Sequence, residues 1–262
     1  LMVKGFYQLS RLKPEEASDD SQFVNYFLDT FLLNRLGTEV LLKQYLAYVG
    51  IRGNVFERSC DLMAIGRQTA QSVQRLCVRE TGFKPTIQLE ATSVLEADKG
   101  GAPMVTCIPG ALSFVLQEIL KNSCHATIMT ALSKEGNTTF NELAKRPISV
   151  IISADDKRVM IRVDDKAGGI PSEAGQKIWH YLYTTASKRG EEATELAGFG
   201  VGLPIARLYT QYLGGSMNLV SLPGYGTQAY VFLPRDPDKV VEVVPDLDHE
   251  WKVQESVGEF IL

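Results

Sequence analysis

The sequence predicts an α+β fold, in which a sandwich of a mixed sheet with helices on one face follows an N-terminal helical region. Up to residue 82, apolar residues recur at intervals of three and four, the spacing of one helix face. Beyond it, strand-like segments alternate with helical ones, an order typical of an α+β sandwich. We therefore expect three parts, which are residues 1–82, 83–235 and an acidic tail, 236–262.

The composition is that of a globular protein. The 262 residues are 45% hydrophobic and 22% charged, enough for one large or two smaller domains. The net charge of −4 comes without any basic block, so we expect no nucleic-acid partner. We also expect no membrane span, because no apolar run is long enough. Four scattered cysteines without a Cys-x-x-Cys pair favour a reducing compartment.

The chain begins with Leu1 rather than Met. We therefore expect the true N-terminus to be missing, and the lack of a targeting peptide excludes no compartment.

Residues 22–49 have the pattern of a long amphipathic helix that needs a partner helix. After a tight junction at residues 50–54, a second helical pattern covers residues 55–79. Two long helices joined so closely predict a helical hairpin or part of a bundle; an all-α structural module is the alternative.

The second part of the chain alternates strands, helices and turns. The predicted strands are residues 86–90, 104–108, 148–154, 158–164, 216–221 and 227–233. The predicted helices are residues 112–130, 176–183 and 202–213. Asp155-Asp156-Lys157 suits a hairpin turn, and Gly214-Gly215 ends the last helix. Residues 133–146 and 188–197 are polar and are expected to be loops.

The helix expected at residues 112–130 places Glu118, Asn122 and His125 on one face. An Asn oxygen is a suitable ligand for magnesium, and a Glu carboxylate can accept a proton from an attacking hydroxyl. Alternatively, these polar side chains merely face water.

Three glycine-rich elements follow this helix. The first, residues 165–171, ends a strand with a carboxylate and lets the backbone turn closely around a ligand. The second, residues 198–203, opens a helix whose free amides can bind phosphate oxygens. The third, residues 224–227, places the hydroxyl of Thr227 at the mouth of a hairpin. Each alone can have a purely conformational reason, but their order indicates a nucleotide site.

Residues 105–233 resemble the GHKL ATP-binding domain of histidine kinases, gyrase-type topoisomerases, mismatch-repair ATPases and ninety-kilodalton chaperones. Within them, residues 118–127, 181–185 and 197–209 are similar to the mitochondrial kinases of 2-oxo acid dehydrogenase complexes, which are the pyruvate dehydrogenase kinases and the branched-chain 2-oxo acid dehydrogenase kinase. Residues 27–35 are similar to the third helix of their N-terminal bundle. The resemblance implies a four-helix regulatory bundle, here incomplete, before a GHKL domain.

The resemblance also implies roles for individual residues. Glu118 would be the general base, and Asn122 would hold Mg²⁺ against the ATP triphosphate. Lys121 would contact phosphate or the acceptor, unless it is a surface lysine. Asp165 would accept the adenine amino group, with Thr227 on the other side. The other residues that the resemblance places at the nucleotide are Gly169 near the base, Thr184 and Thr185 near the ribose or lid, Gly198, Gly200, Val201, Gly202 and Leu203 around the phosphates, and also Ala126, Ala167 and Phe199.

The activity implied is that of an ATP-dependent protein serine kinase in the mitochondrial matrix. It would phosphorylate, and so inhibit, the decarboxylase component of a 2-oxo acid dehydrogenase complex, docking at a lipoyl domain as a homodimer. Phe114, where the pyruvate enzymes have His, weakens the pyruvate assignment, and residues 212–216 lean toward the branched-chain enzyme. Trp251 resembles the tail of the pyruvate enzymes, although it can also pack on its own domain.

One departure from the glycine motif bears on these expectations. Ala167 replaces the first glycine of the Asp-x-Gly-x-Gly box, if Asp165 rather than Asp164 reads the adenine; the other register would put Lys166 at a glycine position.

Three other functions stay open. A histidine kinase needs a phosphorylatable His, and none lies before residue 82. A chaperone or topoisomerase fragment needs a transducer domain after the nucleotide domain. A nucleotide-binding scaffold without catalysis would tolerate Ala167.

Overall fold

A mixed six-stranded sheet with the strand order β2-β4-β5-β7-β6-β8 is the centre of the computed structural model. The structure describes residues 19–93, 103–133, 139–184, 194–196, 198–235 and 260–261. β2 runs parallel to β4 and β6 parallel to β8, and the remaining neighbours are antiparallel. The strands are β2 Ile87–Ser93, β4 Ile148–Ala154, β5 Arg158–Asp165, β6 Ser216–Leu222, β7 Gly226–Pro234 and β8 Phe260–Ile261.

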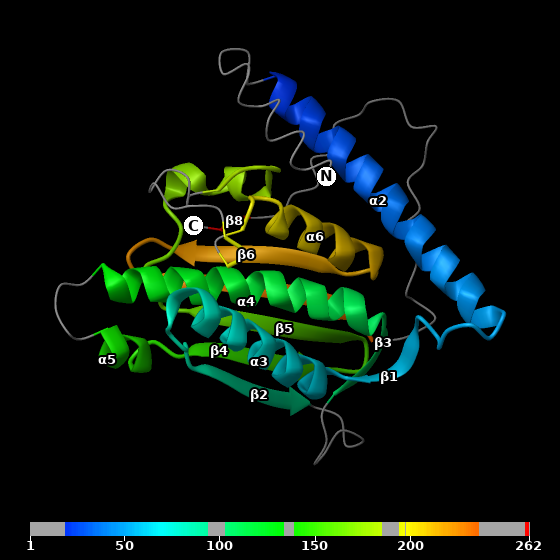
Figure 1. The fold of residues 1–262 in the computed structure, drawn as a ribbon, viewed down its shortest axis with the longest axis horizontal. Helices are drawn as coiled ribbons and strands as arrows, with labels where there is room; N and C mark the ends of the chain where they lie inside the picture. Colours follow the sequence, from blue (N-terminus) through cyan, green and yellow to red (C-terminus); the bar gives the residue numbers. More distant parts are fainter. Residues whose placement is uncertain are drawn as a thin grey trace.

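Three helices pack against this sheet, which confirms the predicted α+β sandwich. They are α3 (Leu62–Thr81), α4 (Pro109–Leu132) and α6 (Gly202–Tyr212). Figure 1 shows α3 and α4 lying across one face of the sheet. α4 lies between α3 and α6 and touches both. Since most of its apolar side chains are buried, α4 is the core helix that the sequence predicts.

The strands form because alternate side chains are apolar. In β4, every second residue from Ile148 to Ala154 is buried, and β5 shows the same alternation. The turn between them is held by Asp155, whose Oδ1 accepts the N–H groups of Lys157 at 2.7 Å and Arg158 at 2.6 Å. This confirms the hairpin predicted there.

The second N-terminal helix begins later than predicted. Residues Glu57–Asp61 form strand β1, which pairs antiparallel with β3 (Met104–Cys107) in a separate two-stranded sheet. The helical expectation for residues 55–61 was wrong because this pairing joins segments far apart in the chain. Asp61 then caps α3 by accepting the Ala64 N–H at 2.9 Å, and Gly82 ends the helix with φ 76°.

The long N-terminal helix is confirmed as α2 (Asp19–Tyr48). It packs on α6, whereas α3 packs on α4, so the two helices do not form the expected hairpin with each other (Figure 1). Leu28, Leu36 and Val40 are the buried residues of α2. α3 belongs to the main apolar core of the sandwich although it precedes residue 82.

Two further segments differ from expectation. Residues 133–146, expected to be a loop, include the short helix α5 (Thr139–Ala144), which buries Leu143. Residues 176–183, expected to be helical, contain only the 3-10 turn η3 (Gln176–Trp179), after a similar turn η2 (Ser172–Ala174). The expectations for Thr185, for Trp251 and for most of residues 188–197 lie outside the described residues.

The described residues add two observations on compartment and membrane. All four cysteines are buried and carry free thiols. None of the helices in the described ranges has the length and apolarity that a membrane crossing requires.

Candidate functional site

The polar side of α4 carries Glu118, Lys121 and Asn122. Glu118 Oε1 lies 2.8 Å from Lys121 Nζ, and both side chains are about one-tenth exposed, at 12% and 10%. Asn122, one turn after Glu118, is exposed. The carboxylate of Glu118 also lies directly against Gly202 at the start of α6, where an added Cβ would collide with Oε2. The predicted general base therefore sits beside the N-terminus of a second helix.

Asp165 ends β5 on the side of the sheet that faces α4. The residue is 7% exposed, and its carboxyl accepts hydrogen bonds from the N–H groups of Ala167 at 3.1 Å and Thr227 at 3.3 Å. Burial raises the pKa of this carboxyl, while hydrogen bonds from Ala167, Ser123 and Thr227 oppose the rise. A buried carboxyl with few partners can accept a hydrogen bond from a ligand N–H group.

The turn after Asp165 is fixed from both sides. On the helix side, Thr130 Oγ1 donates to the Ala167 carbonyl at 2.8 Å. On the strand side, Gly168 exchanges backbone hydrogen bonds with the β6–β7 turn, at 3.1 Å and 2.7 Å. Gly169 has φ 74°, and a Cβ there would run into the Leu222 carbonyl. The backbone of this turn is thus held close to its neighbours, and only glycine fits at position 169.

Ala167 occupies a position that suits a residue with a side chain. Gly168 and Gly169 have positive φ angles, but Leu182 is the one non-glycine residue with a positive φ in the described part of the chain. Ala167 therefore carries no left-handed strain, and replacing the glycine of the motif costs the turn nothing in backbone conformation.

The second glycine element, residues 198–202, leads into α6. Gly198 has φ 74° and Gly200 has φ 71°. Val201, the residue before α6, makes no side-chain hydrogen bond that would cap the N-terminus of this helix. The first amides of the helix are therefore available to an anion, and the helix dipole favours negative charge there. Phe199 is 47% exposed, and Leu203 packs against the main core.

The structure brings the predicted residues to three points along α4. Glu118 meets the start of α6, Ser123 contacts Asp165, and Thr130 holds the turn at Ala167. Ala126 and Thr184 are partly buried, and Thr185 lies outside the described residues. The predicted adenine-reading end and phosphate-binding end thus border the same helix.

This arrangement fits a nucleotide better than a metal alone. A buried carboxyl can accept a hydrogen bond from the adenine amino group, and free backbone amides in a glycine-rich turn can bind phosphate oxygens. Within the described residues, no group of three His, Cys, Asp or Glu side chains is arranged to hold a metal ion. Asn122 would supply one oxygen to Mg²⁺, and phosphate oxygens and water would supply the others.

Sequence reasoning missed several residues that shape the site. Ser221 is fully buried on β6; its hydroxyl accepts the Ile170 N–H at 2.6 Å and lies 3.4 Å from Thr227 Oγ1. Arg146 donates to the Lys166 carbonyl at 2.6 Å. The signal for Ser221 was its inward position in an alternating strand, where a polar residue needs a partner. Arg146 had no local signal.

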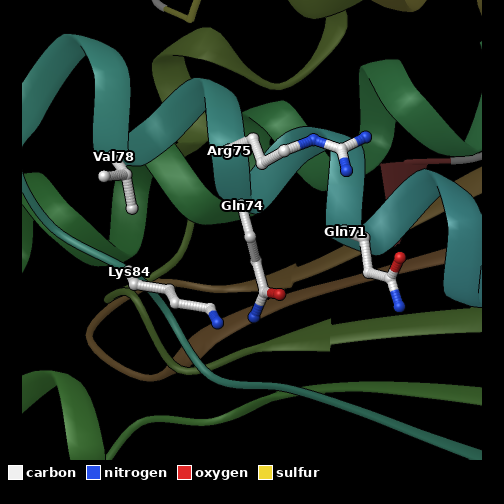
Figure 2. Close-up of a pocket in the computed structure, with 5 residues that line it drawn as sticks. All are labelled: Gln71, Gln74, Arg75, Val78 and Lys84. Atoms are coloured by element: carbon white, nitrogen blue, oxygen red, sulfur yellow. The ribbon is translucent and has the colours of Figure 1, made fainter.

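A separate cavity lies on the outer side of α3. Figure 2 shows its lining, which is Gln71, Gln74, Arg75, Val78 and Lys84. The Gln74 amide donates to the Pro85 carbonyl at 2.8 Å, so part of this lining serves local structure. None of the predicted site residues lines this cavity.

Residues 108–237 match the family described as histidine kinase-, DNA gyrase B- and HSP90-like ATPase. The mitochondrial pyruvate dehydrogenase (acetyl-transferring) kinase isozyme 1 of Rattus norvegicus is 31% identical over 237 residues, 86% of this chain and 52% of the relative. The human isozyme 1 is 30% identical, and the match also covers 86% of this chain and 52% of the relative. The mitochondrial kinase of Ascaris suum is 29% identical over 93% of this chain and 61% of its own. This chain thus spans little more than half the length of these relatives.

Proposed function

We propose that this chain is an ATP-dependent protein serine kinase, because residues 108–237 form a histidine kinase-, DNA gyrase B- and HSP90-like ATPase domain and the chain is similar to mitochondrial pyruvate dehydrogenase kinases. One observation carries the proposal: α4 bears Glu118 against the uncapped start of α6 and also contacts the buried Asp165. The proposed base lies on α4, and the proposed phosphate site and adenine acceptor both border this helix.

Asp165 would accept a hydrogen bond from the adenine amino group. Its carboxylate is preorganised by the N–H groups of Ala167 and Thr227, which hold one oxygen. Gly169 packs against the Leu222 carbonyl at the end of β6, which holds the turn after Asp165 against the sheet. Thr227 would face the base from β7.

The glycine turn and the start of α6 would hold the phosphates through backbone amides. Asn122 would contribute one ligand to Mg²⁺. Bound ATP with Mg²⁺ supplies the transferable phosphoryl group with part of its charge neutralised. Glu118 would accept the proton of the acceptor hydroxyl at a carboxylate oxygen, and Lys121, 2.8 Å from Oε1, keeps that carboxylate oriented.

The substrate that best fits the relatives is the decarboxylase component of a mitochondrial 2-oxo acid dehydrogenase complex. The proposal includes inhibition of that complex, docking at a lipoyl domain, action as a homodimer and a location in the matrix. It rests on relatives whose names give both pyruvate dehydrogenase kinase activity and a mitochondrial location.

The deciding experiment is transfer of labelled phosphate from ATP to purified pyruvate and branched-chain dehydrogenase complexes, side by side. We expect label on a serine of one decarboxylase component. Label on a histidine of this chain would instead favour a histidine-kinase-type protein. ATP binding without any transfer would favour the non-catalytic scaffold.

A further inference from the structure

Tyr181 is held by α2 at both its backbone and its side chain. Its hydroxyl donates a 2.6 Å hydrogen bond to Asp29 Oδ1, and its N–H donates to Asn25 Oδ1 at 2.9 Å. Asn25 and Asp29 lie four residues apart, on the same face of α2. The ring of Tyr181 is 8% exposed and packs with Leu28 and Leu208. The position of Tyr181 is therefore determined by a helix far from it in the chain.

The acceptor of the hydroxyl is itself oriented. Asp29 is partly buried, and Arg207 Nη2 of α6 lies 4.0 Å from its Oδ2. The Arg207 guanidinium in turn lies over the Trp179 ring, 5.0 Å from its centroid. A hydrogen bond to a carboxylate in such surroundings is stronger than one between neutral groups, so it is a specific link between α2 and residues 179–181.

The residues after Tyr181 touch the glycine turn. Leu182 has φ 66°, an angle that a leucine adopts only where its surroundings impose it. The backbone of Leu182 and Tyr183 lies so close to Gly200 that a Cβ there would collide with it. The hydrogen bonds that Tyr181 donates to α2 thus fix the residue before Leu182. The backbone of Leu182 and Tyr183 in turn contacts the glycine element.

Apolar packing continues the same connection. Val24 and Leu32 of α2, Leu182 and Val201 all pack against the cluster formed by Leu28, Tyr181 and Leu208. Val201 belongs to the glycine turn and directly precedes α6. Figure 1 shows α2 lying alongside α6. α2 and the glycine turn are therefore joined through one apolar cluster.

We propose that α2 tunes the affinity of the glycine turn for phosphate groups by fixing Tyr181, so that Tyr181, Asn25 and Asp29 are positioning residues for the nucleotide. This inference rests on the proposed ATP-binding function. Amide donors that are already in place bind an anion without the cost of ordering the turn. If Tyr181 is held less firmly, binding must again order the glycine turn. Only the affinity for ligands that carry phosphate groups is then reduced. The adenine acceptor, Asp165, is held separately by Ala167, Ser123 and Thr227.

The test compares two ligands by calorimetry on the purified chain, ATP with Mg²⁺ and adenosine. Tyr181→Phe removes the hydroxyl and should weaken ATP binding about tenfold, or about 1.4 kcal/mol, while adenosine affinity stays within about twofold. Tyr230→Phe is the matched control, because it also loses a tyrosine hydrogen bond, to Gln228 Oε1 at 2.8 Å, on the sheet side. It should leave both affinities unchanged.

A second variant keeps the test decisive if Tyr181→Phe fails to fold. Asn25→Ala removes the acceptor of the Tyr181 N–H and should also weaken ATP binding while sparing adenosine. Asp29→Asn should have a smaller effect, because its amide oxygen still accepts from the hydroxyl.

The outcomes separate the two proposals. A wild-type chain that binds neither ligand refutes the proposed function. A wild-type chain that binds both, together with a Tyr181→Phe variant that behaves like Tyr230→Phe, refutes the positioning role alone. Equal losses for ATP and adenosine also contradict it, because they would indicate general loosening of the fold.

Discussion

The Glu118 carboxylate of α4 lies against Gly202, the first residue of α6. A Cβ at position 202 would collide with Glu118 Oε2, so only glycine permits this approach. The contact places the proposed base next to amides that would bind phosphate. It also makes the proposed role of Glu118 depend on the identity of a residue 84 positions later in the chain.

Gly202→Ala should therefore impair phosphoryl transfer. The added methyl group must displace the Glu118 carboxylate or shift the start of α6, and a displacement of about 1 Å at a reacting group costs about 100-fold in rate. Initial rates with a dehydrogenase complex measure the loss. Gly110→Ala in α4 is the control, because a Cβ there meets open space and should raise stability by about 0.4–1 kcal/mol. Full activity of Gly202→Ala would show that the contact is dispensable.

Glu118→Gln should separate binding from chemistry. The amide keeps the shape of the side chain but cannot take the proton from the hydroxyl group of the substrate. The rate of phosphoryl transfer should therefore fall about 10²–10⁴-fold, while ATP affinity changes less than about twofold. Rates and calorimetry on the same preparation check this. Glu39→Gln, which removes an exposed ion pair with Lys43 on α2, should leave both unchanged. Normal transfer by Glu118→Gln would exclude Glu118 as the base.

Asp165→Ala should abolish measurable nucleotide binding, because it removes the buried acceptor proposed for the adenine amino group. Calorimetry with ATP and Mg²⁺ measures the effect. Asp164→Ala is the matched control: Asp164 is ion-paired with Arg162 at 3.0 Å and lies on the opposite face of the sheet. If Asp164→Ala lost binding and Asp165→Ala kept it, the assignment of the two aspartates would have to be exchanged.

Asp165 should also give stability a defined pH dependence. Burial raises the pKa of this carboxyl above 3.8, so the folded state holds the proton more tightly than the unfolded chain does. The stability that this provides is complete below pH 3.8 and is lost as pH rises through the folded-state pKa. In urea unfolding at a series of pH values, the stability of the wild type relative to Asp165→Asn should fall as pH rises. A constant or rising difference would contradict the burial of a titrating carboxyl.

Ala167→Gly should not improve nucleotide binding, although it restores the motif. Ala167 has no positive φ, so glycine gains nothing in the folded state and costs about 0.4–1 kcal/mol through greater freedom of the unfolded chain. Thermal unfolding and calorimetry measure the two effects. Gly168→Ala, at φ 92°, should be more damaging than Ala167→Gly because it strains the backbone. A marked gain in ATP affinity for Ala167→Gly would show that the turn adopts another conformation when it binds.

Elements with a strong local pattern could be predicted from the sequence. The β4–β5 hairpin follows from alternation and from an Asp at the turn, and α4 follows from its apolar spacing after Pro109. β1 was missed because its stability comes from β3, whose residues lie more than 40 positions later. α5 was missed because a short polar helix needs the burial of Leu143, which no local pattern reveals.

The candidate site divides in the same way. Helical spacing placed Glu118 and Asn122 on one face, and the glycine pattern placed the turns. Local patterns could not reveal the contact of Glu118 with Gly202 or the hydrogen bond of Ser221 to Ile170. Both join segments whose distance in sequence says nothing about their distance in space.

By itself, the sequence determined the elements whose information is local: the long helices, the hairpins, and the order of a carboxylate-bearing helix and three glycine turns. Only the tertiary structure decided which of them meet. α3 joined the sandwich rather than α2, and α2 reached the glycine turn through Tyr181. The physical reason is that propensity and periodicity act within a few residues, whereas burial and hydrogen-bond satisfaction depend on partners that folding brings together.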